Sequence, residues 1–284
     1  MARLLTGAPV AGAILEGLRR EAEALRARGI APALALVRLG SRADDVSYER
    51  GILRQAGAAG IAVNRHILPL DAGQGELAAL VRGINADTAV HGALIFRPLP
   101  ARIDGSAIAA ALDPAKDMDG ISPGSLAAVY GGGAGLRGFA PCTAEACLAI
   151  LDHYGIGVAG KRVAVIGRSL VAGRPAAMLF LHRDATVTIC HSKTAALDKI
   201  SREADIVVAA LGRPEFLGAP YFRPGQTVID VGIHSREDGT LCGDVRFAEA
   251  EALVEALSPV PGGAGAVTTA LLLRHLVHAA GSPG

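Results

Sequence analysis

The sequence predicts an α/β fold in which helices pack on parallel sheets. Short, nearly continuous apolar segments alternate with longer segments of helical periodicity, a pattern typical of strands that are buried on both faces. Aliphatic residues dominate the composition, because 51% of the chain is hydrophobic while only 4% is aromatic and Trp is absent. With 284 residues, the chain is long enough for two domains or for one large domain.

The N-terminal half alternates between helical and strand patterns. We expect three helix–strand pairs, which are helix Ala11–Arg28 with strand Ala33–Leu39, helix Ser47–Ala59 with strand Ile61–Leu68, and helix Gln74–Ile84 with strand His91–Phe96. Because the strands are short and the helices amphipathic, these pairs predict a parallel sheet with helical crossovers.

The C-terminal half repeats the alternation. A helix is expected at Thr143–Tyr154, with Thr143 as its N-cap and Glu145 in its first turn. Four strands follow, at Arg162–Ile166, Ala185–Cys190, Asp205–Leu211 and Thr227–Val231, and a helix at Ala266–Ala279 closes the chain after a Pro/Gly-rich loop. The glycine-rich stretch Gly131–Gly135 predicts a flexible surface loop that leads into the second domain.

A glycine turn follows the strand at Arg162–Ile166. Gly167, Ser169, Gly173 and Pro175 form the pattern G-x-S-x-x-x-G-x-P before an apolar helix. A strand, tight turn and helix in this order offer backbone N–H groups and the positive end of a helix dipole to a phosphate. The pattern is not the usual G-x-G-x-x-G, so a tight turn without a ligand is the alternative interpretation.

The next strand indicates which nucleotide would bind. An NAD site usually has an acidic residue at this strand end to bind the ribose 2′-hydroxyl. Here the strand ends in His191, Ser192 and Lys193, and Arg168 lies inside the glycine turn. Basic and hydroxyl groups bind a 2′-phosphate that a carboxylate would repel. The sequence therefore predicts NADP rather than NAD.

Charge and apolar runs argue against several other classes of protein. The net charge is +1 with acidic and basic residues interleaved, so neither a nucleic acid nor an acidic membrane is expected as a partner. The uncharged run Ala256–Leu273 is broken by prolines and glycines, and the run Leu4–Leu15 continues into a charged helix. We expect a cytoplasmic protein. Its four cysteines include no C-x-x-C pair, so a metal or disulfide role is not expected.

Further motifs occur in order along the chain. They are Tyr48, Arg97-Pro-Leu-Pro100, Lys116-Asp-Met-Asp-Gly120, Pro141-Cys-Thr143, Asp230-Val-Gly-Ile233 and Pro259-Val-Pro-Gly-Gly263. Together with Gly167-Arg-Ser169 and Cys190-His-Ser-Lys-Thr194, this ordered set resembles the methylenetetrahydrofolate dehydrogenase/methenyltetrahydrofolate cyclohydrolase family over essentially the whole chain.

The resemblance implies a two-domain α/β protein. An N-terminal folate-binding domain would span residues 1–140 together with a C-terminal helix, residues 266–284, that returns to it. A Rossmann-like NADP domain would span residues 141–265. The family is usually a homodimer through the NADP domain, so a homodimer is expected.

The resemblance also implies roles for individual residues. Tyr48 would stack on the pterin or aminobenzoate ring of the substrate. Asp119 would accept hydrogen bonds from the N–H groups of the pterin's amino-pyrimidine ring. Both residues are predicted to be catalytic. Substrate contacts are expected at Tyr48, Pro98, Asp119, Pro261, Gly262 and Gly265. Cofactor contacts are expected at Gly167, Arg168, Ser169, Ser192 and Ile233.

The chain departs from the family at four places. Where members with both activities carry a lysine, four residues after the tyrosine, this chain has Ile52. Where they carry a glutamine, two residues before the proline of P-L-P, it has Phe96. Asp45 stands in place of a serine and Ala266 in place of a proline.

The two apolar replacements predict a change of chemistry. In the family, the glutamine bonds the lysine and the pair handles protons when water attacks the methenyl bridge. A glutamine without its lysine would be an under-bonded buried group, at a cost of about 1–3 kcal/mol, so replacing both removes that cost. Oxidation by hydride transfer needs no general base. Hydration of the methenyl cation does need proton transfer, and an enzyme that loses a positioned acid or base typically slows by about 10²–10⁴. We expect NADP-dependent 5,10-methylenetetrahydrofolate dehydrogenase activity, with weak or absent cyclohydrolase activity.

Two other functions remain open at this point. A rearranged pocket would keep both activities, and a non-catalytic folate- or NADP-binding paralogue would keep neither. Simpler roles are also open for single residues: Tyr48 as a packed helix tyrosine, Asp119 as a helix cap, and Pro261-Gly262-Gly263 as a rigid turn. Lys116 and Asp117 are expected to be structural, and Arg50 and Arg54 to lie on a solvated helix face. Arg97 is expected to point away from Phe96.

Overall fold

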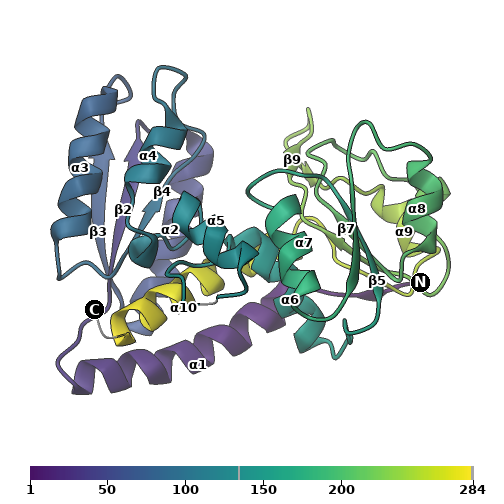
Figure 1. The fold of residues 1–284 in the computed structure, drawn as a ribbon, viewed down its shortest axis with the longest axis horizontal. Coiled ribbons are helices and arrows are strands. Elements are labelled where there is room, and N and C mark those ends of the chain that lie inside the picture. Colours follow the sequence, from purple (N-terminus) through teal and green to yellow (C-terminus); the bar gives the residue numbers. More distant parts are fainter. Residues whose placement is uncertain (134, 283–284) are drawn as a thin grey trace. The chain divides into compact units, whose positions relative to one another are not determined.

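The structure is a computed structural model that describes residues 1–133 and 135–282 (Figure 1). Contacts divide the chain into two compact units. The N-terminal unit comprises Ala13–Ala140 and Thr269–Gly284, and the C-terminal unit comprises Pro141–Thr268 and Met1–Gly12. The expected loop Gly131–Gly135 includes Ala134, which lies outside the described residues.

A three-stranded parallel sheet forms the centre of the N-terminal unit. Its strands are β2 (Ala33–Leu39), β3 (Ala62–Leu68) and β4 (Gly92–Ile95), in the order β3-β2-β4. Every residue of β2 is buried, as expected of a central parallel strand. The predicted parallel α/β fold is confirmed for this half of the chain.

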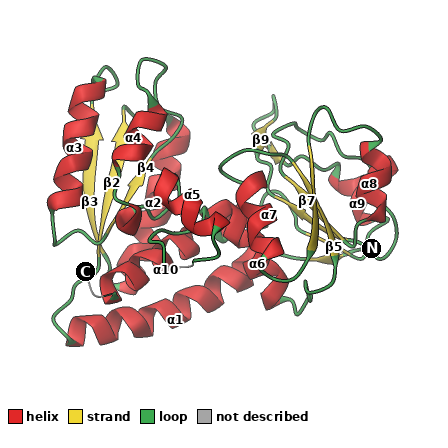
Figure 2. Ribbon diagram, in the orientation of Figure 1, coloured by secondary structure: helices red, strands yellow, loops and turns green. Residues whose placement is uncertain are grey.

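Helices cover this sheet (Figure 2). They are α1 (Gly7–Ala27), α2 (Ala43–Ala59), α3 (Gln74–Ala86), α4 (Gly105–Ala111), α5 (Pro123–Tyr130) and α10 (Thr268–Gly281), with a short 3₁₀ helix η1 (Pro114–Lys116). Leu77 and Val81 of α3 and Ile108 of α4 pack in one core with Ala35 and Val37 of β2. One face of the sheet is therefore sealed by α3 and α4.

The C-terminal unit contains a six-stranded parallel sheet. Its strands are β1 (Arg3–Leu4), β5 (Arg162–Ile166), β6 (Thr186–Cys190), β7 (Ile206–Ala209), β8 (Thr227–Asp230) and β11 (Ala256–Leu257), in the order β1-β11-β8-β7-β5-β6. The antiparallel strands β9 (His234–Ser235) and β10 (Leu241–Cys242) form a separate hairpin. The α-helices of this unit are α6 (Cys142–His153), α7 (Gly173–Leu181), α8 (Leu197–Glu203) and α9 (Phe247–Glu251). Two short 3₁₀ helices are η2 (Ala219–Tyr221) and η3 (Ala264–Ala266).

Three details differ from the sequence predictions. The first 12 residues belong to the C-terminal unit rather than to the N-terminal domain, because β1 pairs in parallel with β11. Thr143 is not an N-cap, because α6 begins at Cys142 after Pro141 and has no side-chain cap. Helix α2 begins four residues earlier than expected, at Ala43, with Asp44 and Asp45 in its first turn, where acidic residues favour the helix dipole. Glu145 lies in the first turn of α6 as predicted.

Among the described residues, no helix combines the length and apolar character needed to cross a membrane. All four cysteines are buried, and none of them forms a disulfide.

Candidate functional site

In the N-terminal unit, Tyr48 and Phe96 lie in direct contact. Tyr48 is on α2 and Phe96 follows β4; their ring centroids are 5.7 Å apart and their planes are inclined by 70°. Tyr48 is 37% exposed, whereas Phe96 is 7% exposed. The arrangement leaves part of the tyrosine ring accessible for stacking and supports it from the side with an apolar ring.

Ile52 belongs to the buried stripe of α2. This stripe consists of Asp45, Glu49, Ile52, Ala56 and Ala59, which repeat at helical spacing. The side chain of Ile52 is fully enclosed because it lies on this inward face. Position 52 is thus a dry site in this chain. Arg50 and Arg54 are exposed, which confirms the solvated face expected for them.

Two carboxylates anchor the same stripe. Glu49 pairs with Arg38 of β2 at 2.5 Å and with Arg65 of β3. Burial raises the pKa of Glu49, but hydrogen bonds from both arginines outweigh that effect and hold it below the usual value. Asp45 pairs with Arg42 at 3.0 Å. Sequence reasoning missed the Glu49 cluster, since its members come from three different elements.

Arg97 reaches Asp119. Its Nη2 donates to Oδ2 of Asp119 at 2.9 Å. Burial raises the pKa of Asp119 above its usual value, and the nearby carboxylate of Asp117 adds to this rise. The guanidinium of Arg97 and, to a smaller extent, His275 lower the pKa but do not cancel the effect of burial. The helix-cap role considered for Asp119 belongs to Ser122, whose side chain accepts from the Ser125 N–H at the start of α5. Asp117 fixes the turn before that helix, because it accepts from the backbone N–H groups of Ile121 and Ser122 at 3.1 and 2.7 Å.

Lys116 has a structural role, as expected. Its Nζ donates to the carbonyl oxygens of Ile84, Asn85 and Asp87 at the C-terminal end of α3. A lysine at this place satisfies carbonyls that the helix itself leaves without partners.

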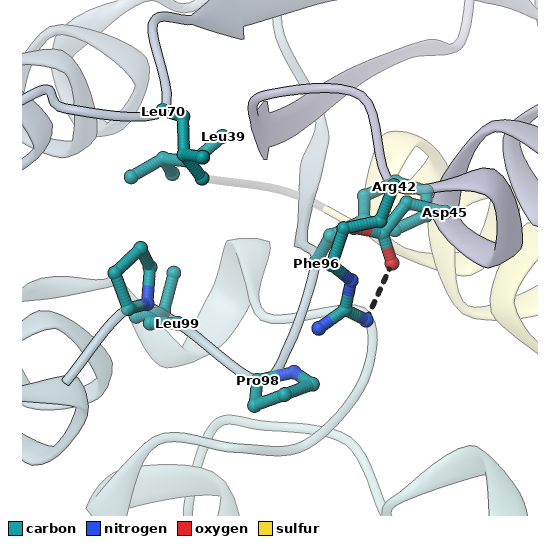
Figure 3. A pocket seen from close by; sticks show the side chains of 8 residues that line it. Leu39, Arg42, Asp45, Leu70, Phe96, Pro98 and Leu99 are labelled. Atoms are coloured by element: carbon teal, nitrogen blue, oxygen red, sulfur yellow. Dashed lines mark hydrogen bonds and ion pairs between the residues drawn. The ribbon is translucent and has the colours of Figure 1, made fainter.

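A pocket of about 210 Å³ lies where the strands β2, β3 and β4 reach their carboxyl ends. Its lining residues are Leu39, Arg42, Asp45, Leu70, Phe96, Pro98, Leu99 and Pro100. Figure 3 shows the Arg42–Asp45 ion pair on the same side as Phe96, with Leu39 and Leu70 grouped elsewhere on the wall. Open parallel sheets bind ligands at this edge, so the pocket and its border residues Phe96 and Pro98 are candidates for substrate contact.

In the C-terminal unit, the glycine turn is shaped by close backbone packing. Gly167 has φ +134° and a Cβ there would overlap the carbonyl oxygen of Ala210. A Cβ on Gly173 would likewise overlap the backbone carbonyl of Gly167. The hydroxyl of Ser169 accepts from the N–H groups of Ala172 and Gly173 at 3.2 and 3.4 Å, and so orders the turn before α7. A backbone cradle of this kind fits a dinucleotide phosphate.

The predicted 2′-phosphate residues lie at matching places on neighbouring strands. Ile166 of β5 pairs with Cys190 of β6, so Arg168 and Ser192 each follow that pair by two residues. Both residues are exposed. The turn that carries Ser192 is closed by a hydrogen bond of 2.8 Å from the His191 N–H to Thr194 Oγ1. The positive and hydroxyl groups at this sheet edge fit NADP.

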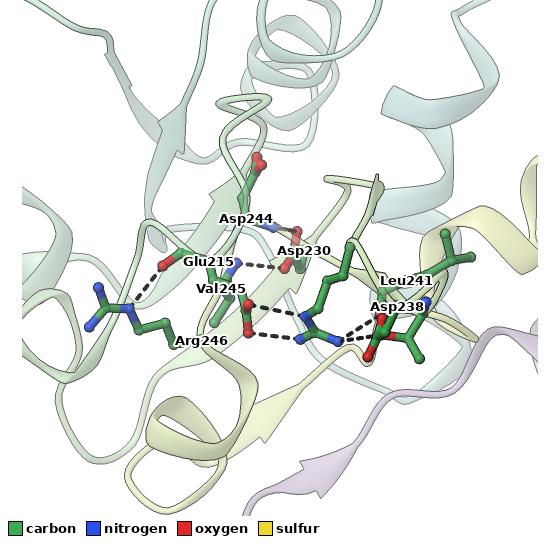
Figure 4. Close-up of polar contacts among 9 residues, drawn as sticks. Glu215, Asp230, Asp238, Leu241, Asp244, Val245 and Arg246 are labelled. Carbon is green, nitrogen blue, oxygen red and sulfur yellow. Dashed lines mark hydrogen bonds and ion pairs between the residues drawn. The ribbon is translucent and has the colours of Figure 1, made fainter.

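Two buried carboxylates, Asp230 and Asp244 (Figure 4), hold the loop that contains Ile233. The side chain of Ile233 is 63% exposed. Asp230 accepts from the N–H groups of Gly232, Asp244 and Val245 at 2.9, 3.1 and 2.9 Å. Burial raises the pKa of Asp230 to about 6, although these N–H groups oppose the rise.

Asp244 extends this arrangement to a neighbouring loop. It accepts from the N–H groups of Leu211, Gly212 and Arg213 at 2.6, 3.0 and 2.8 Å, and its Oδ1 lies 2.8 Å from His234 Nε2. Asp244 could not be predicted from the sequence, because no local pattern indicates that one carboxylate joins two loops.

The Pro/Gly-rich loop of residues 259–265, the signature loop, is packed against the start of α1. The carbonyl oxygen of Gly262 accepts from the N–H of Gly7 at 2.7 Å, and a Cβ on Gly7 would overlap the carbonyl oxygen of Gly263. Pro261, Gly262 and Gly265 are exposed. The loop is therefore both a fixed turn and an accessible surface. The substrate candidates fall in both units: Tyr48, Pro98 and Asp119 in one, and the signature-loop residues in the other.

Known families match most of the chain. The family described as "Tetrahydrofolate dehydrogenase/cyclohydrolase, catalytic domain" matches residues 5–119. The family described as "Tetrahydrofolate dehydrogenase/cyclohydrolase, NAD(P)-binding domain" matches residues 141–282.

Relatives and solved structures agree with these matches. The chain is 44% identical to the bifunctional protein FolD 1 of Desulfitobacterium hafniense over 98% of this chain and 99% of that protein. Its fold is similar to that of the bifunctional enzyme FolD from Campylobacter jejuni, with a TM-score of 0.94, 34% identity and coverage of 99% of both chains. It is also similar to the FolD of Trypanosoma brucei complexed with NADP cofactor and inhibitor, with a TM-score of 0.91, 35% identity and coverage of 98% and 97%.

Proposed function

The chain belongs to the tetrahydrofolate dehydrogenase/cyclohydrolase family, and we propose that it oxidises 5,10-methylenetetrahydrofolate to 5,10-methenyltetrahydrofolate with NADP while its cyclohydrolase activity is weak or absent. The observation that carries this proposal is the environment of positions 52 and 96. Ile52 is fully buried and Phe96 is nearly so, and Phe96 packs on Tyr48. Neither side chain can donate or accept a proton.

The chemistry explains why the two activities separate. Oxidation of the methylene carbon produces a cation that is delocalised over two folate nitrogens, and the protein has only to align that carbon with the cofactor. Hydration of the cation needs a group that manages the proton of the attacking water. Arg42, Arg50 and Arg54 are poor substitutes, because an arginine stays protonated and is a weak base.

The C-terminal unit is proposed to bind the cofactor, whose nicotinamide accepts the hydride when bound. The glycine turn at Gly167 and Ser169 would hold the pyrophosphate, and Arg168 with Ser192 the 2′-phosphate. Ile233 would cover the nicotinamide ring with an apolar surface. The family's NAD(P)-binding domain and the NADP found with the Trypanosoma brucei relative support this cofactor.

The N-terminal unit is proposed to bind the folate. Tyr48 would stack on an aromatic ring of the substrate, with Phe96 and Pro98 beside it. Asp119 would accept N–H bonds from the amino-pyrimidine. Pro261, Gly262 and Gly265 are proposed as further substrate contacts from the signature loop. A cytoplasmic homodimer is proposed on the family resemblance, and sedimentation of the pure protein tests its oligomeric state.

One experiment separates the proposed function from its rival. Pure protein is incubated with 5,10-methylenetetrahydrofolate and NADP, and NADPH and the folate species are followed separately, with the FolD 1 of Desulfitobacterium hafniense as the bifunctional control. We expect NADPH and methenyl product to accumulate together. Conversion of the methenyl product to the 10-formyl form at the control's rate would favour the second candidate, a bifunctional enzyme. The bifunctional FolD proteins among its relatives support this candidate. If no NADPH forms, the remaining candidate is a non-catalytic folate- or NADP-binding paralogue.

A further inference from the structure

The ion pair between Arg97 and Asp119 presents an accessible polar edge. A single hydrogen bond of 2.9 Å, from Nη2 to Oδ2, joins these two among the described residues. The side chains are 33% and 24% exposed. A carboxylate has a second oxygen and a guanidinium has five N–H groups, so the pair retains both an acceptor and donors that it does not use internally.

Both members are anchored to the same strand. Arg97 follows Phe96 directly after β4, and the Phe96 N–H bonds to the Val37 carbonyl at 2.8 Å. Asp119 follows Met118, whose N–H bonds to the Ala93 carbonyl of β4 at 3.2 Å. His275 Nδ1 lies 2.9 Å from the Met118 carbonyl oxygen. The pair is therefore held in place by neighbouring backbone before any ligand binds, which lowers the entropy lost on binding.

The chemistry of the pair matches one kind of heterocycle. A carboxylate beside a guanidinium offers an acceptor next to donors, with no net charge. A 2-amino-4-oxo-pyrimidine ring, which is the end group of a folate, presents two N–H donors followed by a carbonyl acceptor along one edge. In a 2,4-diamino-pyrimidine ring, an amino donor replaces that carbonyl and the neighbouring ring N–H becomes an acceptor nitrogen. The amino donor would face the N–H groups of the guanidinium.

We propose that Arg97 is a specificity-determining residue that selects the 4-oxo form of the pterin by donating to its carbonyl oxygen, while Asp119 accepts from the ring N–H groups. This inference rests on the proposed folate substrate. A site that donates a hydrogen bond rejects a ligand whose matching group is also a donor, because both groups are then left unpaired. Without Arg97, the unneutralised Asp119 would instead favour the more basic diamino ring.

The test compares two ligands on four proteins. The KM for 5,10-methylenetetrahydrofolate and the inhibition constant of the 2,4-diamino analogue of tetrahydrofolate are measured for the unaltered protein, Arg97→Leu, Arg97→Gln and Arg54→Leu. Arg54 is an exposed arginine on α2 and serves as the matched control. Gln keeps a donor without the charge. Thermal unfolding of each variant checks that it is folded.

The expected result is a change in the ratio of the two constants. In Arg97→Leu, the preference for the 4-oxo ligand should fall at least about tenfold, while Arg97→Gln should keep part of it and Arg54→Leu all of it. An unchanged ratio in folded Arg97→Leu, or an equal fall in Arg54→Leu, overturns the inference. If Arg97→Leu does not fold, Arg97→Gln decides the question: an unchanged ratio of the two constants in that variant overturns the inference. Absence of NADPH formation by the unaltered protein would instead refute the proposed function, so the two failures are distinct.

Discussion

The ring of Phe96 meets the ring of Tyr48 edge-on, with centroids 5.7 Å apart. By the family resemblance, Phe96 stands where bifunctional members carry a glutamine, so an apolar ring would replace an amide next to the tyrosine that we propose stacks on the substrate. The partner of that amide is replaced by Ile52, which the structure buries completely. The positions that the resemblance assigns to the proton-handling pair are therefore both apolar in this chain.

Restoring the lysine alone should fail. Ile52→Lys places an ammonium on the buried stripe of α2, where desolvation lowers its pKa and the charge lacks a partner. We expect it to destabilise the protein by about 3 kcal/mol or more and to leave methenyl hydrolysis slow. Ile52→Lys with Phe96→Gln should hydrolyse the methenyl substrate faster than the sum of the single changes, because the two residues act as a unit. Hydrolysis rates and thermal unfolding of all three variants check this. Strictly additive effects would contradict it.

Arg168→Ala should discriminate between the two cofactors. Removing the guanidinium takes away a charge-assisted bond to the 2′-phosphate, which NAD lacks. We expect the KM for NADP to rise at least about tenfold with little change for NAD. Lys161→Ala is the matched control, because this exposed lysine precedes the amino end of β5, whereas Arg168 follows its carboxyl end. Equal use of NADP and NAD by the unaltered protein would refute the cofactor assignment to these residues.

Asp119→Asn should weaken folate binding and spare the cofactor. An amide accepts on one side only, so the variant cannot bind both Arg97 and the pterin as the carboxylate does. The expected result is a KM for folate raised at least about tenfold at an unchanged KM for NADP. Asp117→Asn is the contrast: Asp117 bonds the N–H groups of Ile121 and Ser122, so its loss should lower the unfolding temperature instead. Unchanged folate affinity in Asp119→Asn would leave Asp119 a structural residue.

Asp230 should make stability depend on pH in an unusual direction. Burial raises its pKa from 3.8 to about 6, so the folded protein holds this proton more tightly than the unfolded chain does. The stability it contributes is fully present below pH 3.8 and is lost as pH rises through about 6, a change of about 3 kcal/mol for this group.

Asp230→Asn isolates that contribution. The variant should be less stable overall, because one amide oxygen cannot serve the N–H groups of Gly232, Asp244 and Val245 together. Its deficit relative to the unaltered protein should shrink as the pH rises from about 4 to about 6. Chemical denaturation across this range measures the difference. A deficit that grows with pH would mean that Asp230 is ionised throughout.

Local patterns in the sequence were sufficient for much of the fold. The strand at Ala33–Leu39 and the strand at Arg162–Ile166 have the predicted bounds, because a continuous apolar run between helical segments is itself the mark of a buried parallel strand. The tight turn at Gly167 was also predictable, since only glycine accepts its φ and its close approach to Ala210. The apolar replacements at positions 52 and 96 were inferred from the family resemblance, whose motifs place these two positions in the chain.

Only the tertiary structure decided how distant residues meet. The pairing of β1 with β11 joins the first residues to the C-terminal unit, and such two-residue strands carry no periodicity from which they could be predicted. The approach of Arg97 to Asp119, the enclosure of Ile52 beside Glu49, and the two loops joined by Asp244 depend in the same way on which elements pack together. The physical reason is that periodicity and spacing encode local conformation and the identity of side chains, whereas ion pairs and burial depend on strand register and packing between segments far apart in the chain.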